Sequence, residues 1–408
     1  MKAMPAYGLP PLRLQALLTA GGPVAGTGAE PSASELDSMG KAVLRLQRGL
    51  TGERALAGAS YMDDPELLAA YLLYYWPVSY AQATRALELA GLRPASILDL
   101  GSGPGPMAAA ALDRGAARAM LVDKSAGALA LAERILAPAS VSSTCLELDA
   151  LAQGDGPPLR ENAALDGEER FELVCFGHSL NEFHAGENGR IGLRAALVER
   201  AALRLAEGGS VLIIDPATLA AARDALALRD ALCARGWRVI APCTTDAPCP
   251  ALAAGASHSC HDEAAWAVPR IVEALASRAG LDRALIKMSW FALRPPEPRS
   301  YPSAVADSLA AKREHGPFPA SDQKTLYRVV SEPMLNKAGR VRRLICGIGG
   351  RFPLSAKRGD QNAEAAGFFA LRRYDLIELD KPERREGGWG IAADTRIRVA
   401  QSPEPGLL

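Results

Sequence analysis

Apolar residues recur at three- to four-residue spacing through the first quarter of the chain, a pattern that is typical of amphipathic helices. Residues 32–50 form one such stretch. A second begins at Asp64, a residue type that caps helices, and continues to Trp76-Pro77. We expect the proline to end this helix because its ring clashes with the preceding turn. The pattern therefore predicts an N-terminal helical region over residues 1–92.

The second predicted helix and the residues just after it carry an aromatic stripe. Aromatic rings of this kind can stack on RNA bases. Packing against the next domain is the commoner use of such a stripe, and we expect it here. The residues are Tyr71, Tyr74, Tyr75, Trp76 and Tyr80.

From residue 96 onwards, short apolar runs that suit strands alternate with helical stretches. Such alternation is typical of a mainly parallel, doubly wound α/β sheet. The predicted strands are 97–100, 119–123, 145–149, 171–176, 211–215, 237–240 and 284–293. Seven is also the strand count of the Rossmann-like sheet of class I methyltransferases. Residues 93–294 are therefore predicted to form an α/β domain of that class.

A Pro-rich segment follows this domain, with four prolines in the nine residues from Arg294 to Pro302. Prolines at this density oppose both helix and sheet, so residues 295–324 are predicted to be a linker. Beyond it, 325–330 and 341–345 flank a turn at 336–339 and are expected to pair as a hairpin. Residues 325–408 are therefore predicted to form a small β-rich domain.

The composition is that of a globular protein with a sizeable core, since 49% of the 408 residues are apolar and 23% are charged. The formal net charge is zero, but the charge is unevenly placed. From Arg283 to the end there are 22 Lys and Arg against 14 Asp and Glu, whereas the first 282 residues have 24 against 32. A basic C-terminal region suits contact with a phosphate backbone, and a merely solvated surface is the alternative.

No apolar run approaches the ~18 residues of a membrane span, and the N-terminus lacks the charged and apolar regions of a secretory signal. We therefore expect an intracellular protein without membrane contact. In a reducing compartment its seven cysteines would be metal ligands or free thiols, and not disulfides.

A glycine-rich turn joins the first predicted strand to the next helix, in the segment Ile97–Pro106. Gly101, Gly103 and Gly105 would let the backbone approach a ligand closely, and the amides at the helix start could receive an anionic group. Pro106 suits a first helical turn but stands where a dinucleotide fingerprint would have glycine.

Three carboxylates lie at or next to the ends of the first three predicted strands. Asp123 lies 22 residues after Gly101, where it could accept hydrogen bonds from both ribose hydroxyls of a nucleotide cofactor. Asp99 resembles the acidic residue of the S-adenosylmethionine motif, and Asp149 stands where the adenine amine would lie. These features favour S-adenosylmethionine over a dinucleotide as the cofactor.

In a sheet of this kind the transferred methyl group would face the loop after the fourth strand, here Gly177–Phe183. Asn181 and Glu182 could accept hydrogen bonds from an amine, and His178 could act as a base. The loop lacks the paired prolines of enzymes that methylate amino groups on bases. Roles as loop caps or cofactor contacts are the alternative for all three residues.

Cys243, Cys249 and Cys260 lie in a Pro-rich stretch after the sixth predicted strand, and Cys346 lies far downstream. Four soft ligands suit either a tetrahedral zinc or a [4Fe-4S] cluster, and the spacing alone does not choose between them. His258 or His261 could replace Cys346 in a zinc site.

Two other uses of the cysteines can be weighed from their positions. Cysteine nucleophiles of cytosine C5 methyltransferases follow the fourth strand of the sheet, which disfavours that role for the Pro-Cys pairs here. The other three cysteines are expected to be core residues, the usual fate of a free cysteine. These are Cys145, Cys175 and Cys233.

Taken together, these motifs resemble the methyltransferase-like proteins of the mitochondrial small ribosomal subunit and their bacterial relatives. The resemblance covers roughly residues 60–380. It is carried by Leu98–Gly105, Ser179–Glu182, Ala241–Pro250 with Cys260-His261, and Leu344–Gly347. It implies a [4Fe-4S] cluster on Cys243, Cys249, Cys260 and Cys346. It also implies association with small-subunit ribosomal RNA and ribosomal proteins, and a role in assembling that subunit.

Two functional hypotheses follow. The first is an enzyme that transfers a methyl group from S-adenosylmethionine to small-subunit ribosomal RNA. The second is a non-catalytic assembly factor that uses the fold as an RNA-binding platform, with the four cysteines as a zinc or iron-sulfur structural element. We expect a monomer when free, located in the bacterial cytoplasm or, in a eukaryote, in the mitochondrial matrix.

Overall fold

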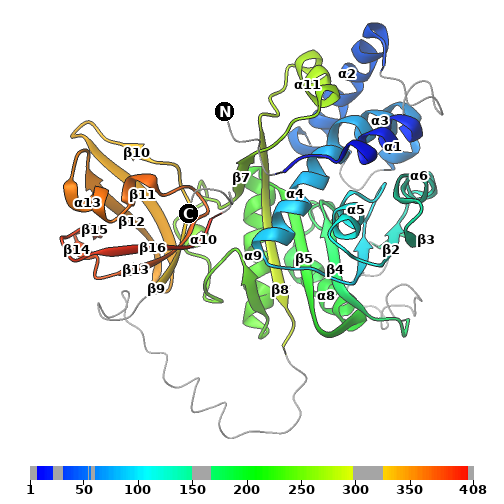
Figure 1. The fold of residues 1–408 in the computed structure, drawn as a ribbon. Helices are drawn as coiled ribbons and strands as arrows, with labels where there is room; N and C mark the ends of the chain where they lie inside the picture. Colours follow the sequence, from blue (N-terminus) through cyan, green and yellow to red (C-terminus); the bar gives the residue numbers. More distant parts are fainter. Residues whose placement is uncertain are drawn as a thin grey trace, which may run out of the picture.

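The computed structural model of the protein describes residues 7–21, 31–53, 55–56, 60–148, 167–296 and 325–402. Figure 1 shows an α/β body with the N-terminal helices gathered at one end of it. A second, β-rich region formed by the C-terminal residues lies beside the body. This arrangement confirms the predicted fold class.

The body is built on one mixed sheet. Its strands are β1 (Ser96–Leu100), β2 (Arg118–Asp123), β3 (Ser140–Cys145), β4 (Phe171–Gly177), β5 (Leu205–Pro216), β6 (Arg238–Ala241), β7 (Asp262–Ala265) and β8 (Leu285–Arg294). They are ordered β3-β2-β1-β4-β5-β8-β6, and β7 also pairs with β8. The first five strands run parallel, while β8 is antiparallel to β5, β6 and β7. Because the strand order reverses between β1 and β4, a ligand crevice is expected at their carboxyl ends.

The third strand lies earlier in the chain than predicted, at Ser140–Cys145 instead of 145–149. β3 pairs only with β2 at the edge of the sheet, so its hydroxyl-rich residues need not be apolar on both faces. Leu146 and Leu148, which suggested a strand, instead line a cavity just beyond it. Cys145 is exposed, so its predicted place in the core was wrong.

Two helical layers cover the two faces of this sheet. Helices α4 (Trp76–Leu89), α5 (Pro106–Asp113) and α6 (Ala126–Leu136) pack on one face, and α8 (Arg190–Ala201) and α9 (Leu219–Ala234) on the other. Strand residues alternate between the layers: Ile97 belongs to the first core, whereas Leu98 and Leu100 belong to the second. Four buried alanines, 108–111, let α5 approach the sheet closely.

The two predicted N-terminal helices are present as α2 (Ala33–Gln47) and α3 (Pro65–Ala70). A further helix, α1 (Pro11–Gly21), was not predicted, and α11 (Arg270–Ala279) packs against α2. Ser32 and Glu35 form a capping box, which stabilises the start of α2. The side chain of Asp64 accepts hydrogen bonds from the first amides of α3, which confirms the predicted start of this helix.

The predicted helix end at Trp76-Pro77 was wrong. A π-helical turn, η3 (Tyr71–Tyr75), follows α3, and Pro77 then stands in the first turn of α4. At a first-turn position proline needs no intrahelical amide bond, so the chain continues as a helix. The predicted packing role of the aromatic stripe is confirmed for Tyr71, Tyr74, Trp76 and Tyr80, which are buried.

The C-terminal region folds as a second sheet with its own core. Its strands are β9 (Thr325–Val329), β10 (Met334–Leu335), β11 (Arg340–Gly347), β12 (Gly350–Lys357), β13 (Leu376–Asp380), β14 (Glu383–Arg385), β15 (Gly388–Gly390) and β16 (Arg396–Gln401). The predicted hairpin strands do pair, as antiparallel β9 and β11. The turn at 336–339, however, closes β10 against β11, because β10 intervenes.

Side chains of this region reach the α/β body at several points. Arg328 donates from Nε to the carbonyl of Pro242 at 3.0 Å, and Gln401 donates from Nε2 to the carbonyl of Leu89 at 3.0 Å. Arg373 forms an ion pair with Glu263 of β7. Some of the basic residues of the C-terminal region therefore make contacts inside the molecule and do not lie on its open surface.

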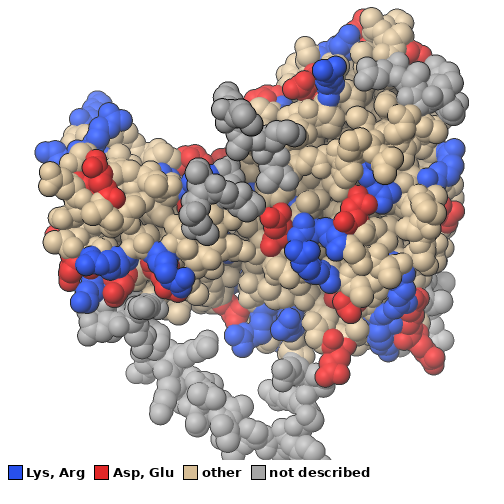
Figure 2. All heavy atoms as spheres, viewed as in Figure 1, with Lys and Arg blue, Asp and Glu red and all other residues tan. Residues whose placement is uncertain are grey.

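Figure 2 shows one face of the molecule, on which basic and acidic side chains are interspersed over both the body and the C-terminal region. Residues 325–402 carry 15 Lys and Arg against 9 Asp and Glu. Arg328 and Arg343 are buried members of that set. No helix among the residues that the structure describes is long and apolar enough to cross a membrane.

Candidate active site and cysteine cavity

A cavity of about 400 Å³ opens at the carboxyl ends of β1, β2 and β4. This size is typical of a small-molecule site, and the position is the strand-order reversal where ligands bind in open α/β sheets. Its walls include the glycine turn after β1, the end of β2, the loop after β4 and the N-terminal helical region. Residues 146–148, 216–218 and 281–283 complete them.

Gly101 and Gly103 line the cavity, and both need to be glycine. Each has a positive φ, +70° and +50°. A Cβ on Gly101 would stand 2.4 Å from the Cβ of Ser179, and one on Gly103 would stand 3.0 Å from Cε of Met62. Gly105 differs, because it precedes α5 and its α-carbon faces the side chain of Leu136 instead of the cavity.

Asp123, at the end of β2, also lines the cavity and is held in place by backbone amides. Its two carboxylate oxygens accept from the amides of Gly103 at 2.7 Å and Ser125 at 2.9 Å. Burial raises the pKa of Asp123, while these two amide donors oppose the rise. The lone pairs left over could accept the hydroxyls of a ribose.

Asp99 lies behind the glycine turn and not on the cavity wall. It is fully buried, and Oδ2 accepts from the amide of Ala108 in the first turn of α5 at 3.2 Å. Burial is the main cause that raises the pKa of Asp99 to about 7, and the charge of Asp123 adds to it. Asp99 therefore caps α5, where Gly105 has no side chain to do so.

Asp149 lies outside the described residues. The residues just before it, Leu146, Glu147 and Leu148, form part of the cavity wall. The cavity thus extends to the segment that was predicted to contact an adenine ring.

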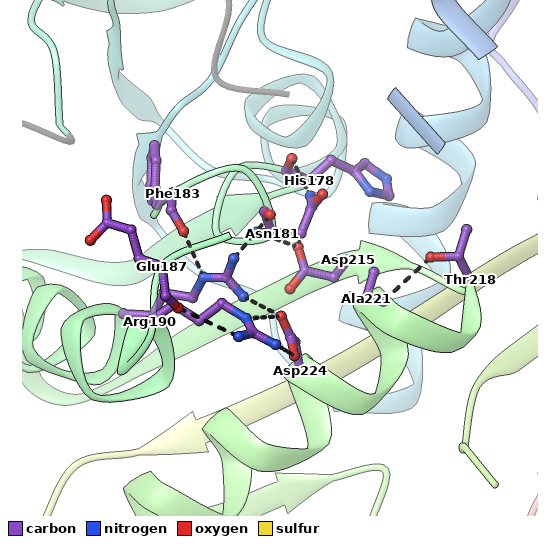
Figure 3. A network of polar contacts seen from close by, with 10 residues as sticks. His178, Asn181, Phe183, Glu187, Arg190, Asp215, Thr218, Ala221 and Asp224 are labelled. Carbon is purple, nitrogen blue, oxygen red and sulfur yellow. Dashed lines mark hydrogen bonds and ion pairs between the residues drawn. The ribbon is translucent and has the colours of Figure 1, made fainter. Parts of the chain in front are cut away.

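His178 begins the loop after β4 and has a left-handed backbone conformation, with φ 61°. Its imidazole points away from Asp215 and Asn181 (Figure 3), and Nε2 lies 2.7 Å from Oε1 of Gln82 on α4. Burial, followed by the nearby charge of Arg283, lowers the pKa of His178 to about 4. The imidazole is therefore neutral at pH 7, which makes it a weak base.

Asn181 and Glu182 are placed differently. Asn181 is buried, and its Nδ2 donates to the carbonyl of His178 at 2.7 Å and to Oδ1 of Asp215 at 3.2 Å. Its side chain thus braces the loop (Figure 3). Glu182 is half-buried and lines the cavity, and its charge contributes to raising the pKa of Tyr71, for which burial is the larger cause. All three predicted catalytic residues, His178, Asn181 and Glu182, line the cavity.

A buried arginine that the sequence reasoning missed supports this loop. Arg194 of α8 donates to the carbonyls of Phe183 at 2.8 Å and Asn181 at 3.0 Å, and pairs with Asp224 of α9 at 3.0 Å. The only hint in the sequence was a charged residue on the apolar face of α8. Asp215 could have been found as Asp123 was, because it too follows an apolar strand.

The four cysteines of the predicted metal site line one small cavity of about 40 Å³ between the body and the C-terminal region. Cys243 follows β6, Cys249 precedes α10 (Pro250–Ala253), Cys260 precedes β7, and Cys346 lies in β11. The sequence prediction that Cys346 joins the other three across two regions of the chain agrees with this geometry.

Two arginines hold the loop that carries Cys243 and Cys249. Arg229 of α9 donates to the carbonyls of Thr245 and Ala247 from one side. Arg328 of β9 holds the carbonyl of Pro242 from the C-terminal region. The amide of Cys249 donates to Oδ2 of Asp230 at 2.8 Å.

The environment of the thiols is apolar with cations at its edge. Burial raises the pKa of Cys260 to about 11 and that of Cys346 to about 12, and it raises the pKa of Cys243 further. Arg351 opposes these rises for Cys260 and Cys346. Binding of a metal by these thiols would therefore have to displace protons.

Within the described ranges, no three His, Cys, Asp or Glu side chains are arranged to hold a single metal ion. His258 is exposed, and neither it nor His261 lines the cysteine cavity. The structure thus gives no support to a zinc site in which a histidine replaces Cys346. The four cysteines line one cavity, but they are not arranged as a ready ligand set for a metal ion.

The lowered pKa of His178 predicts how stability depends on pH. An unfolded histidine titrates near pH 6.5, so from there down to about pH 4 the unfolded chain binds a proton that the folded chain does not. The resulting stability is present above pH 6.5 and lost as the pH falls. Compared with His178→Asn, the wild type should lose about 1 to 2 kcal/mol more between pH 7.5 and pH 5 in urea unfolding. Parallel pH profiles would contradict this burial of the imidazole.

The strand order, the antiparallel β8 and the glycine turn that meets the cavity define the class I fold of S-adenosylmethionine-dependent methyltransferases. Within that class, the chain belongs to the family of the mitochondrial small ribosomal subunit protein Rsm22, whose sequence profile matches residues 65–282. The family predicted from the motifs is thereby confirmed. No curated protein matches the chain at a significant level.

Three solved structures with a similar fold are distant in sequence. The ribosomal protein L11 methylase of Lactobacillus delbrueckii subsp. bulgaricus is 14% identical, with 54% of this chain and 79% of that one covered and a TM-score of 0.31. The plantazolicin methyltransferase BpumL, in complex with SAH, is 11% identical over 64% and 98%, with a TM-score of 0.33. The amino pentose methyltransferase CalS10 of Micromonospora echinaspora is 19% identical over 34% and 50%, with a TM-score of 0.24.

Proposed function

We propose that the protein binds S-adenosylmethionine and transfers its methyl group to ribosomal RNA of the small subunit during assembly of that subunit. The observation that carries this proposal is the single cavity of about 400 Å³ that joins the glycine turn and Asp123 to the loop holding Glu182. Membership of the Rsm22 family supports the ribosomal context. The site of action would be the mitochondrial matrix in a eukaryote and the cytoplasm in a bacterium.

In this proposal the cavity residues divide into two groups. Gly101, Gly103 and Asp123 hold the cofactor, with the Asp123 carboxylate on the ribose hydroxyls. Glu182 accepts a hydrogen bond from the acceptor amine and orients it toward the methyl group. Asn181 fixes the loop, and neutral His178 positions Gln82 without a change of charge at pH 7. The cofactor supplies the electrophilic methyl group.

Transfer can be tested with S-adenosylmethionine labelled in its methyl group and small subunits taken at an immature stage. The wild type should label the RNA, and Glu182→Gln should lower the initial rate by about 10- to 100-fold while cofactor binding stays intact. Glu187→Gln, in the same loop but outside the cavity, serves as the control. Absence of label in every assembly intermediate would contradict the enzymatic proposal.

A second function, non-catalytic support of subunit assembly, is favoured by two observations. Asn181 spends its side-chain amide on bracing the loop, and the paired prolines of amine-methylating enzymes are missing. If a variant shown to have lost cofactor binding still rescued assembly fully in cells lacking the protein, this second function would replace the first.

We further propose that Cys243, Cys249, Cys260 and Cys346 ligate a [4Fe-4S] cluster. What supports this proposal is that all four thiols line one small cavity, and four cysteines are the usual ligands of such a cluster. Zinc is the alternative metal for the same four thiols. Arg229 and Arg351 beside the thiols complement the negative charge of a thiolate-bound cluster. The cluster would join the C-terminal region to the body.

Protein purified without oxygen should therefore be brown, with about four iron atoms per chain if the cluster is intact. Ser replacement of any one of the four cysteines should remove most of the iron and of the broad visible absorption. Cys145→Ser, which changes an exposed thiol far from the cavity, should leave both unchanged. A colourless wild type with one zinc per chain would contradict the cluster.

A further inference from the structure

Three tyrosines form a row along one wall of the cavity. The ring centroids of Tyr61 and Tyr71 are 6.5 Å apart, and Tyr71 and Tyr75 are stacked at 5.8 Å. Tyr61 adjoins Met62, whose Cε approaches Gly103 of the cofactor turn. All three tyrosines line the cavity. The row therefore leads away from the place assigned to the cofactor.

Arg283 stands at the far end of this row. It lies in the turn between α11 and β8, and its guanidinium is 5.4 Å from the ring centroid of Tyr75 and 4.9 Å from that of Tyr74. Nε donates to the hydroxyl of Tyr74 at 2.9 Å, and the carbonyl of Arg283 accepts from Trp266. In the described part of the chain no carboxylate forms an ion pair with Arg283, although its side chain lines the cavity.

An aromatic wall that ends in a fixed guanidinium recognises a planar ring that carries an anionic group. Because Tyr71 and Tyr75 stack on each other and Arg283 lies over the ring of Tyr75, a base would meet the cavity-facing edges of these rings. Arginine binds phosphate through paired N–H donors. The cavity is too small for a helical segment of RNA, so only a nucleotide turned out of its stack could enter. A protein side chain offers neither the phosphate nor, in most cases, the ring.

We propose that the cavity accepts one unstacked nucleotide of RNA, with its base against Tyr71 and Tyr75 and its phosphate on Arg283. This inference rests on the proposed function, because the nucleotide would be the methyl acceptor. Glu182, which lies near Tyr71, would then face the edge of the base. Arg283 is a specificity-determining residue in this arrangement and takes no part in the transfer itself.

The test uses the full chain saturated with S-adenosylhomocysteine, and binding is followed by ligand-observed NMR. The probes are the four nucleoside 5′-monophosphates and the four matching nucleosides. At least one monophosphate should bind about tenfold more tightly than its nucleoside. Arg283→Gln should abolish that preference and leave nucleoside binding unchanged, Arg283→Lys should keep part of it, and Tyr75→Leu should weaken both ligands. Arg235→Gln, at an exposed ion pair with Glu199, is the control and should change nothing.

Each outcome bears on a different claim. If S-adenosylhomocysteine itself does not bind, the proposed function fails before this inference is reached. If it binds but monophosphates and nucleosides bind equally, or not at all, the nucleotide site is overturned and a protein side chain becomes the better acceptor. The inference is also overturned if Arg283→Gln keeps the full preference for the monophosphate.

Discussion

Replacing Asp262 by alanine should lower the free energy of unfolding by about 3–5 kcal/mol, because it leaves a buried arginine without its counter-charge. Arg85 donates to the two Asp262 oxygens at 2.7 and 2.9 Å, and Trp290 donates to one of them at 3.3 Å. The guanidinium of Arg85 also lies over the rings of Tyr7 and Tyr374. The ion pair thus joins the N-terminal segment, the α/β body and the C-terminal region.

Urea unfolding at pH 7 measures this effect, and the chain offers a matched control. Asp37→Ala removes an acidic partner of the same type from Arg278, but that pair is exposed and should cost less than about 1 kcal/mol. The double variant Arg85→Met/Asp262→Leu should recover much of the loss because it leaves no buried charge. Equal small losses for Asp262→Ala and Asp37→Ala would mean that Arg85 is not buried as described.

The second large effect is expected at Gly101, where alanine should weaken S-adenosylmethionine binding at least about 100-fold. The added Cβ would stand 2.4 Å from the Cβ of Ser179, whose hydroxyl donates to the carbonyl of Leu100. Either the glycine turn or the loop after β4 must then shift, and both line the cavity. Left-handed backbone strain adds about 1–2 kcal/mol to the loss of stability.

Gly91 provides the control for Gly101→Ala. Its φ of +66° is close to that of Gly101, but a Cβ there would meet nothing within 4 Å. Gly91→Ala should therefore cost only the backbone strain and leave cofactor binding unchanged, as calorimetric titration can show. If the two alanine variants bind the cofactor equally well, the close approach at Gly101 does not shape the site.

Much of the cofactor half of the cavity could be predicted from the sequence. Gly101 and Gly103 could be predicted because a backbone position with a positive φ strongly favours glycine, which is visible in the sequence. Asp123 could be found because it ends an apolar strand at a fixed distance from the glycine turn. Asp99 was placed correctly at the strand end. Its role as a cap of α5, however, depends on how the glycine turn folds back over Asp99, and no local sequence pattern predicts this.

The acceptor half could not be predicted, because its residues come together only through tertiary packing. Tyr71 and Tyr75 could be identified as helical, but the proline rule that ended the helix at Pro77 ignored a π-helical turn. Arg283 is distant in sequence from these tyrosines and stands in a turn without a motif. β7 was missed because Asp262–Ala265 has no alternation of apolar and polar residues. In the structure it pairs with β8.

The spacing of the cysteines alone is a weak predictor of a shared site, whereas the fold brings all four to one cavity. Cys243, Cys249 and Cys260 are near one another in sequence, whereas Cys346 is brought to them by β11 of the second sheet. The set of four cysteines suggested Cys346 as the fourth ligand, and the resemblance to a family implied the same four residues. Arg229 and Arg328, which clamp the loop from either side, carried no sequence signal because each lies within an ordinary helix or strand.

Titration calorimetry of the full chain with S-adenosylmethionine tests whether the cavity at the ends of β1 and β2 binds this cofactor. We expect one saturable site per chain, with an affinity reduced at least about tenfold by Asp123→Asn, which removes the negative charge that accepts the ribose hydroxyls. No binding by a chain that is folded by circular dichroism, or equal binding by the wild type and Asp123→Asn, would contradict the account.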